Sequence, residues 1–173
     1  MHCDKHVVKM IIEYAQLLST AHRILDGQEY VDKTTNGRSI RRWRMSDDVE
    51  NVLMKASHIN HPSAVWARQS ADNYLWLYHL WFDLCQEYTY RYEKVHSCYN
   101  RLKAVLYKVP KNILLKEFTQ PPPAMPDDCK ILGDSLGSYR KYYVERKNHF
   151  AKWKCREVPV WYAEGLNKNN AHV

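Results

Sequence analysis

The stretch "DKHVVKMIIEYAQLLSTAHRIL", residues 4–25, decides the fold class of this chain. Apolar residues recur in it at steps of three and four, which is the spacing of one face of an α-helix. We expect Asp4 to cap the start of this helix and Gly27 to end it in the left-handed conformation. Its buried side is predicted to consist of Val7, Val8, Ile11, Ala15, Leu18, His22 and Leu25.

The polar side of the same helix places a single carboxylate, Glu13, among bases and amides. The members of this stripe follow one another at steps of three or four and are His6, Lys9, Glu13, Gln16, Thr20 and Arg23. A surface carboxylate paired with a nearby lysine is one interpretation. The other is a catalytic acid or base that a basic protein holds beside an anionic substrate. The residues alone leave both interpretations open.

The composition indicates a folded basic protein of one domain, residues 1–173. Hydrophobic residues make up 45% and only 5 residues are Gly, so disorder is not expected. Lys and Arg number 26 against 19 Asp and Glu, a formal net charge of +7, and cations gain free energy from phosphate contacts by counterion release. No run of about 18 apolar residues predicts a membrane span, and no secretory signal pattern opens the chain. The five cysteines are irregularly spaced, as in reduced cytoplasmic proteins.

Helical spacing recurs along most of the remaining chain. We expect a short helix over 49–57, a long central helix from Ser63 to about Glu93, another helix within 96–107, and a last one from about Leu132 to Trp153. No segment shows the strong two-residue alternation of a half-buried strand. The fold class is therefore predicted to be mainly α, a single compact helical domain.

Three segments are expected to lie outside these helices. Residues 28–48 predict a polar basic loop that turns at Asn36-Gly37. Five prolines within 108–128 predict an extended connector, since proline lacks a backbone donor and fixes φ. The polar tail after Trp153 is expected to fray.

The loop at 28–48 holds four arginines within seven residues around one tryptophan. Such a cluster repels itself without an anionic partner, although a solvated loop is the plainer alternative. The tryptophan offers a ring on which a base can stack. The predicted nucleic-acid contacts here and on the neighbouring elements are Arg38, Arg41, Arg42, Trp43, Arg44, Lys9, Arg23 and His61.

Other chemistry finds little support. His2, Cys3 and His6 invite a zinc site with His58 and His61, yet nothing in the sequence brings the two groups together. Neither a P-loop, nor a dinucleotide-binding glycine turn, nor a GxSxG nucleophile elbow is present. We therefore predict neither a metal nor a cofactor.

The first helix resembles that of the phage pyrimidine-dimer DNA glycosylases of the endonuclease V type. In that family an acid and a histidine stand two residues apart, and a catalytic glutamate follows seven residues after the histidine. Asp4, His6 and Glu13 keep these spacings. The segments CDKHVVKMI and AQLLSTAHR resemble more closely a subgroup of small phage proteins.

Shorter likenesses to the glycosylase family cover much of the chain. "NGRSIRRWR" (36–44) is similar to its Asn-Gly-basic loop, "NHP" (60–62) with the helix to Arg91 is similar to its central helix, and "VPVWYAEG" (158–165) is similar to its aromatic tail. The resemblance implies a mostly helical domain that acts as a monomer on damaged or modified duplex DNA. It also implies a location in the host cytoplasm.

The resemblance further implies a DNA-repair hydrolase, a glycosylase with Glu13 and His6 at catalytic positions and a strand-cleavage step. The family's nucleophile for that step is the amine of a small N-terminal residue, whereas here bulky His2 follows Met1, so no matching nucleophile is expected. A start upstream of Met1, a missing lyase step and another use of the scaffold stay open. A non-catalytic nucleic-acid-binding protein and a phage inhibitor of a host protein are the alternative functions.

Overall fold

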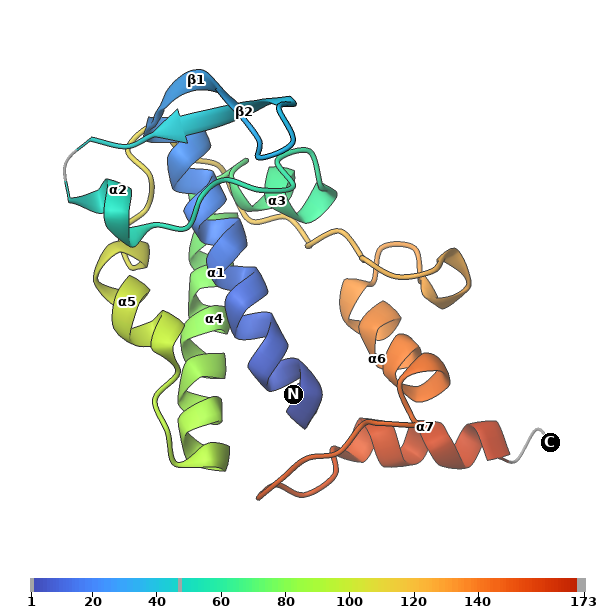
Figure 1. Cartoon of the computed structure of the whole chain (residues 1–173). Helices are drawn as coiled ribbons and strands as arrows, with labels where there is room; N and C mark the ends of the chain where they lie inside the picture. Colours follow the sequence, from blue (N-terminus) through green and yellow to red (C-terminus); the bar gives the residue numbers. More distant parts are fainter. Residues whose placement is uncertain (1, 47, 171–173) are drawn as a thin grey trace.

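A computed structural model describes residues 2–46 and 48–170 of the chain, and it is mainly helical (Figure 1). The predicted first helix is confirmed as α1, Asp4–Asp26. It lies along α4, Ala71–Tyr92, and their facing side chains form the main apolar core. Trp81 of α4 is fully buried in this core and donates a hydrogen bond from Nε1 to the carbonyl oxygen of Ile11, at 3.1 Å.

The ends of α1 differ from the prediction. Asp4 does not cap the helix: Cys3 occupies the cap position, and the Asp4 carboxylate accepts the backbone N–H of Lys154 at 2.9 Å. Gly27 has φ −87° and is extended rather than left-handed. Glycine is still required there, because a Cβ would lie 2.4 Å from the carbonyl oxygen of Arg23. Val8, expected to be buried, is 40% exposed.

The predicted central helix is broken into two. α3 spans Pro62–Ala67 and α4 starts anew at Ala71, because the hydroxyl of Ser70 accepts a hydrogen bond from the backbone N–H of Asn73 at 3.1 Å and caps the second helix. The helix predicted within 96–107 is confirmed as α5, Ser97–Leu106. The helix predicted over 49–57 is shorter than expected: α2 spans Val49–Val52, and residues 53–57 are irregular.

The basic segment after α1 is a β-hairpin, so the prediction of a loop without strands is wrong. β1, Gln28–Lys33, pairs antiparallel with β2, Ser39–Arg44, in a register that sets Gln28 opposite Arg44. The predicted turn is confirmed, with Gly37 at φ +75°. The strands escaped detection because both of their faces carry charged side chains, which hides the usual alternation of apolar and polar residues.

The C-terminal part packs as a separate layer against the start of α1, on the right of Figure 1. The proline-rich connector leads as predicted, without helix or strand, to a short 3-10 helix at Asp127–Cys129 and then to α6, Ser135–Arg146. The last predicted helix therefore starts later and ends earlier than expected.

The tail forms a helix instead of fraying: α7 spans Val160–Asn170. It is held because Tyr162 is buried against Tyr143 and Trp153 in a second apolar cluster that also includes Cys3. None of the helices described here is long and apolar enough to cross a bilayer.

Candidate nucleic-acid interface

The polar stripe of α1 divides into two halves with different surroundings. In the C-terminal half, the Gln16 amide donates to the carbonyl oxygen of Lys55 at 2.6 Å, and the Thr20 hydroxyl accepts the backbone N–H of Ser57 at 3.3 Å. These contacts fasten the irregular segment after α2 onto the helix. This half of the stripe is therefore a packing surface and is not open to a ligand.

Arg23 completes that half, and its predicted role as a nucleic-acid contact is wrong. Only 2% of it is exposed. Its guanidinium binds the Glu50 carboxylate at 2.7 Å and donates to a set of backbone carbonyls at 2.6–3.0 Å, those of Trp43, Glu50, Leu53 and Met54. All of its donors are directed inward, so Arg23 joins the hairpin and the residue 50–54 segment to α1.

The N-terminal half of the stripe is open. The Glu13 side chain is 45% exposed and forms an ion pair with Nζ of Lys9, at 3.1 Å and one helical turn away. This is the pairing that the surface-carboxylate interpretation requires. It leaves both charged groups accessible from solvent.

His6, the other predicted catalytic residue, lies against the C-terminal layer. A hydrogen bond joins its Nδ1 to the Tyr143 hydroxyl, and its ring meets those of Tyr143 and Phe150 edge-on. Burial lowers the pKa of His6, and the nearby ammonium groups of Lys147 and Lys9 lower it further, while Glu13 acts in the opposite direction. His6 is therefore held neutral at physiological pH.

Asp4, His6 and Glu13 keep the family spacing, but they bind three different partners. Asp4 accepts a hydrogen bond from Arg91 at 2.9 Å, while His6 contacts Tyr143 and Glu13 contacts Lys9. The three side chains do not converge on a common point. The resemblance in spacing is thus not matched by a catalytic triad.

The histidines considered as zinc ligands are engaged elsewhere. His2 Nε2 is hydrogen-bonded to the Tyr14 hydroxyl at 2.8 Å, and burial lowers the pKa of His2 to about 3. His58 contacts the Ser57 hydroxyl at 3.1 Å, and His61 accepts the backbone N–H of Ser63 at the start of α3. His61, predicted to contact nucleic acid, is exposed and caps a helix.

One other group has metal-like geometry. Ligand atoms of Asp128, Cys129 and Glu145 lie within 4.8 Å of one another among the described residues. Arg146 already binds Asp128, and Nζ of Lys141 lies 3.9 Å from Glu145. Arg146 and Lys141 thus already neutralise the Asp128 and Glu145 carboxylates, as a metal ion would have to do.

The hairpin arginines fall into two groups. Arg41 is matched by a bidentate ion pair with Glu29, at 2.6 and 2.7 Å, and stacks beside Trp43. Arg38 and Arg44 are exposed, and Arg42 is half-buried. No carboxylate within the described ranges lies within ion-pair distance of any of these three.

Trp43 is only 6% exposed, so the prediction that a base stacks on it is wrong. Its Cβ lies against Gly27, where the hairpin leaves α1. The hairpin register places Trp43 on one face with Arg41, whereas Arg42 and Arg44 share the opposite face with Tyr30. The Arg44 guanidinium lies 5.0 Å from the centre of the Tyr30 ring, which gives that face an aromatic side chain beside its cations.

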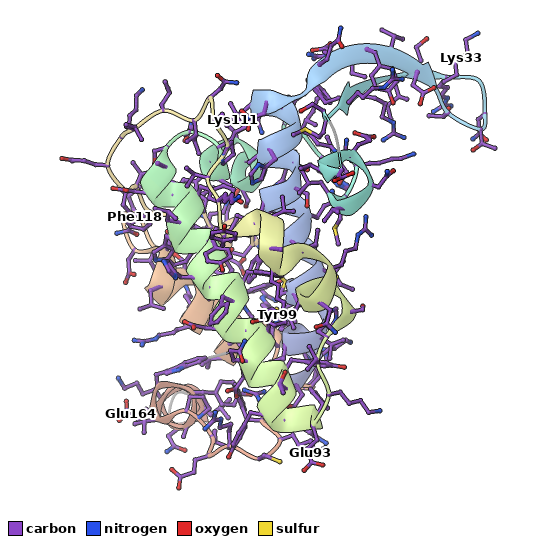
Figure 2. All side chains as sticks on the ribbon, turned by 90° about the vertical axis from the view of Figure 1, so that its left-hand side faces the viewer. Lys33, Glu93, Tyr99, Lys111, Phe118 and Glu164 are labelled. Carbon is purple, nitrogen blue, oxygen red and sulfur yellow. The ribbon has the colours of Figure 1, made fainter. Side chains whose placement is uncertain are left out.

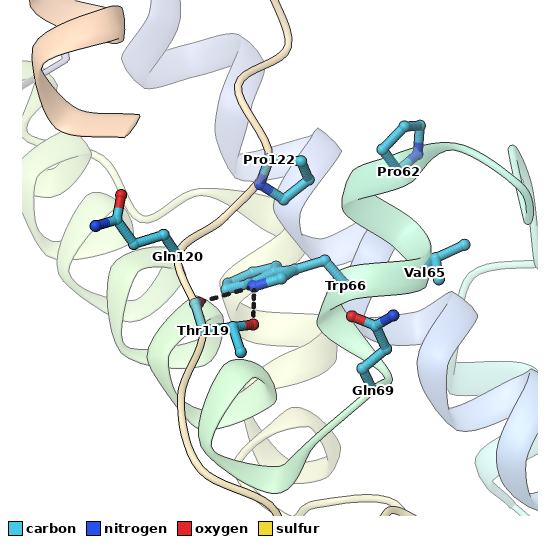
Figure 3. A pocket seen from close by; sticks show the side chains of 7 residues that line it. All are labelled: Pro62, Val65, Trp66, Gln69, Thr119, Gln120 and Pro122. Atoms are coloured by element: carbon cyan, nitrogen blue, oxygen red, sulfur yellow. Dashed lines mark hydrogen bonds between the residues drawn. The ribbon is translucent and has the colours of Figure 1, made fainter. Parts of the chain in front are cut away.

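A shallow surface pocket lies away from these residues, between α3 and the connector (Figure 3). It measures about 410 Å³ and is lined by Pro62, Val65, Trp66, Gln69, Thr119, Gln120 and Pro122. Trp66 forms its floor and donates from Nε1 to the Thr119 carbonyl oxygen at 2.9 Å. Neither Glu13 nor His6 lines it.

Sequence reasoning missed this pocket and the residues around His6. The His6–Tyr143 contact joins positions 137 apart in the chain, and Trp66 meets Thr119 across 53 positions. Spacing along one helix carries no signal for such contacts.

Comparison of the chain with protein-family models gives no match, and no significant match arises among curated proteins or solved structures. The resemblance to the pyrimidine-dimer glycosylases therefore stays a prediction.

Proposed function

We propose that this protein binds nucleic acid through the β-hairpin, with Arg38, Arg42 and Arg44 as the main contacts. The observation that carries the proposal is a contrast within the hairpin: Glu29 neutralises Arg41, whereas no described carboxylate pairs with Arg38, Arg42 or Arg44. A two-stranded ribbon of this kind fits the major groove of duplex DNA, and arginine binds both phosphates and guanine edges.

The test compares the double variant Arg38→Ala/Arg44→Ala with Arg41→Ala as the matched control. The double variant should flatten the dependence of log affinity on log salt by about one unit per lost phosphate contact, measured on duplex DNA by fluorescence anisotropy. Arg41→Ala should change the slope less, because its charge is already paired. Absence of binding to any DNA or RNA, or an affinity independent of salt, contradicts the proposal.

DNA-base chemistry at Glu13 is the second candidate function, a glycosylase or DNA-modification enzyme. One observation favours it: Glu13 stays half-exposed on the N-terminal half of the polar stripe of α1. On the same half, His6 is neutral and has no carboxylate partner among the described residues. A carboxylate in such a place would stabilise the positive charge that grows on the sugar as a base leaves. Glu13 lies thirteen residues before the end of α1, roughly 20 Å along the axis from the hairpin.

Glu13→Gln and Lys9→Gln form a matched pair for this candidate. Both remove the same ion pair, so a purely structural role predicts equal and small effects, within about 0.5 kcal/mol of stability. A catalytic role predicts that only Glu13→Gln reduces turnover, by a factor of about a hundred or more. Turnover is measured on ultraviolet-irradiated and undamaged duplexes, with and without an N-terminal extension. If no substrate is turned over, or if the two variants behave alike, the catalytic role is excluded.

A further inference from the structure

The segment from Lys94 to Lys116 contains six cations and no acid. It comprises α5 and the chain that follows it. The cations are all exposed, and they are Lys94, Arg101, Lys103, Lys108, Lys111 and Lys116. The hairpin, residues 28–44, holds five cations and two acids. Outside these two segments the chain holds two more acids than cations, which gives the formal net charge of +7. Residues 94–116 therefore carry a net charge of +6, twice the +3 of the hairpin.

Eight lysines and arginines outside residues 94–116 take part in ion pairs among the described residues. Ion pairs in the described residues involve lysines or arginines of α1, β2, α4, α6 and the segments beside α6. None of the six cations of residues 94–116 has a described carboxylate within 4.0 Å. Cations that lack such pairs keep their full attraction for an external polyanion, although they also repel one another.

The outer side of α5 combines these charges with aromatic rings. Tyr99, Lys103 and Tyr107 follow at steps of four, so they share one side of the helix. Nζ of Lys103 lies 5.0 Å from the centre of the Tyr99 ring, and Nζ of Lys108 lies 5.4 Å from that of Tyr107, which is 52% exposed. Phosphates and bases are bound by this combination of ammonium groups and ring faces.

Two contacts fix this segment beside the hairpin. The carboxylate of Asp26, the last residue of α1, accepts the backbone N–H groups of Lys111 and Asn112 at 2.8 and 2.9 Å. Arg101 donates to the Val52 carbonyl oxygen at 2.7 Å, which joins α5 to α2. Figure 2 shows the result: Tyr99 on α5 faces the viewer, Lys111 lies near the end of α1, and the hairpin projects above with Lys33 near its tip.

We propose that Lys103, Tyr107, Lys108 and Lys111, here called the α5 surface, form a second contact region for the phosphodiester backbone of the nucleic acid bound by the hairpin. The inference rests on the proposed function and extends it, because the bound strand then continues from the hairpin across α5. We favour nucleic acid over an anionic bilayer because Asn100 and Ala104, which are exposed on α5, offer no large aliphatic side chain for insertion. The exposed Leu114 and Leu115 follow Lys111 and lie outside the α5 surface.

The test uses the full-length triple variant Lys103→Gln/Lys108→Gln/Lys111→Gln. Its control removes three paired cations from the C-terminal layer, in the variant Lys130→Gln/Lys141→Gln/Arg146→Gln. Both lower the net charge by the same amount. Affinity is measured against salt for a long duplex and for a duplex just long enough to fill the hairpin.

We expect the α5 variant to lose roughly one unit of salt slope per lysine on the long duplex and to bind the short duplex as the wild type does. The paired-cation control should leave both affinities unchanged, and a Lys→Arg triple at the α5 positions should restore the slope. The melting temperature of each variant shows that the fold is intact.

Wild-type affinity of the α5 variant for the long duplex would overturn the inference, and so would an equal loss in the paired-cation control. In either case, weaker nucleic-acid binding by the Arg38→Ala/Arg44→Ala variant would still support binding through the hairpin. Failure of the wild type to bind any nucleic acid would remove both proposals. Binding to vesicles with an anionic lipid, but not to nucleic acid, would assign the α5 surface to membranes instead.

Discussion

The C-terminal layer and the α5 segment both carry many cations, but they use them differently. Residues 127–170 hold nine lysines and arginines with six acids, whereas residues 94–116 hold six cations with none. In the C-terminal layer, Arg146 pairs with Asp128 and Lys130 with Asp127. Arg140, not in an ion pair of the described residues, lies over the Trp161 ring. Four of the nine cations of that layer are in ion pairs among the described residues, whereas none of the six cations of residues 94–116 is.

The interior and the hairpin also differ in whether their arginines are paired with carboxylates. Arg91 is fully buried between the Asp4 and Glu87 carboxylates, and Arg156 pairs with Glu87 from the far side. This network connects α1, α4 and the chain before α7. Removing Arg91 leaves the Asp4 carboxylate without a cation and leaves Glu87 with Arg156 alone, whereas removing an exposed hairpin arginine such as Arg44 leaves no described carboxylate without its partner.

The largest expected effect is therefore at Arg91. Arg91→Ala should lower the free energy of unfolding by about 3–5 kcal/mol, because it leaves Asp4 and Glu87 without their buried partner. Chemical denaturation followed by circular dichroism measures this loss. A loss below about 1 kcal/mol would mean that the network does not hold the C-terminal layer to α1 and α4.

The second effect is on the pH dependence of stability. Burial lowers the pKa values of His2 and His6 in the folded state, to about 3 for His2. The unfolded chain then binds more protons below about pH 6.5, so stability is complete above that pH and falls as the pH drops, by about 1.4 kcal/mol per pH unit for each proton excluded.

Denaturant midpoints across this pH range measure the effect. His6→Phe should make the decline shallower, and the exposed control His79→Gln should not. Stability that rises as the pH falls below 6.5 would contradict the assignment of neutral histidines between α1 and α6.

A smaller effect is expected for a paired but exposed cation. Arg146→Ala should lower the free energy of unfolding far less than Arg91→Ala, since its pair with Asp128 lies in solvent, where water and salt screen the attraction. Comparing its unfolding midpoint with that of Arg91→Ala tests the division into buried and exposed networks directly. Equal losses of stability in the two variants would contradict the distinction between buried and exposed ion pairs.

The smallest effect on stability is expected on the α5 surface. Lys103→Gln/Lys108→Gln should change the free energy of unfolding by no more than about 0.5 kcal/mol, because neither ammonium group has a described carboxylate partner. Thermal unfolding in moderate salt measures it. A marked destabilisation would show that these lysines serve the fold and would weaken their assignment to a partner.

Much of the helical framework was predictable because it depends on local spacing. The periodicity of residues 4–25 predicted α1 within a residue at its C-terminal end, and the prolines predicted the connector. The break at Ser70 and the helix at Val160–Asn170 were not predicted. The first depends on a single capping hydrogen bond, and the second depends on burial of Tyr162 in a cluster built from distant residues.

By itself the sequence determined a mainly helical chain with an amphipathic first helix, a turn at Asn36-Gly37 and an excess of positive charge. Only the tertiary structure decided what each charge does. Arg23 and Arg44 look alike in the sequence, yet Arg23 is enclosed by backbone carbonyls from positions 20 to 31 residues away, while Arg44 lies exposed on the hairpin. A guanidinium surrounded by fixed acceptors has no donor left for a ligand, and which acceptors surround it depends on contacts that local spacing does not encode.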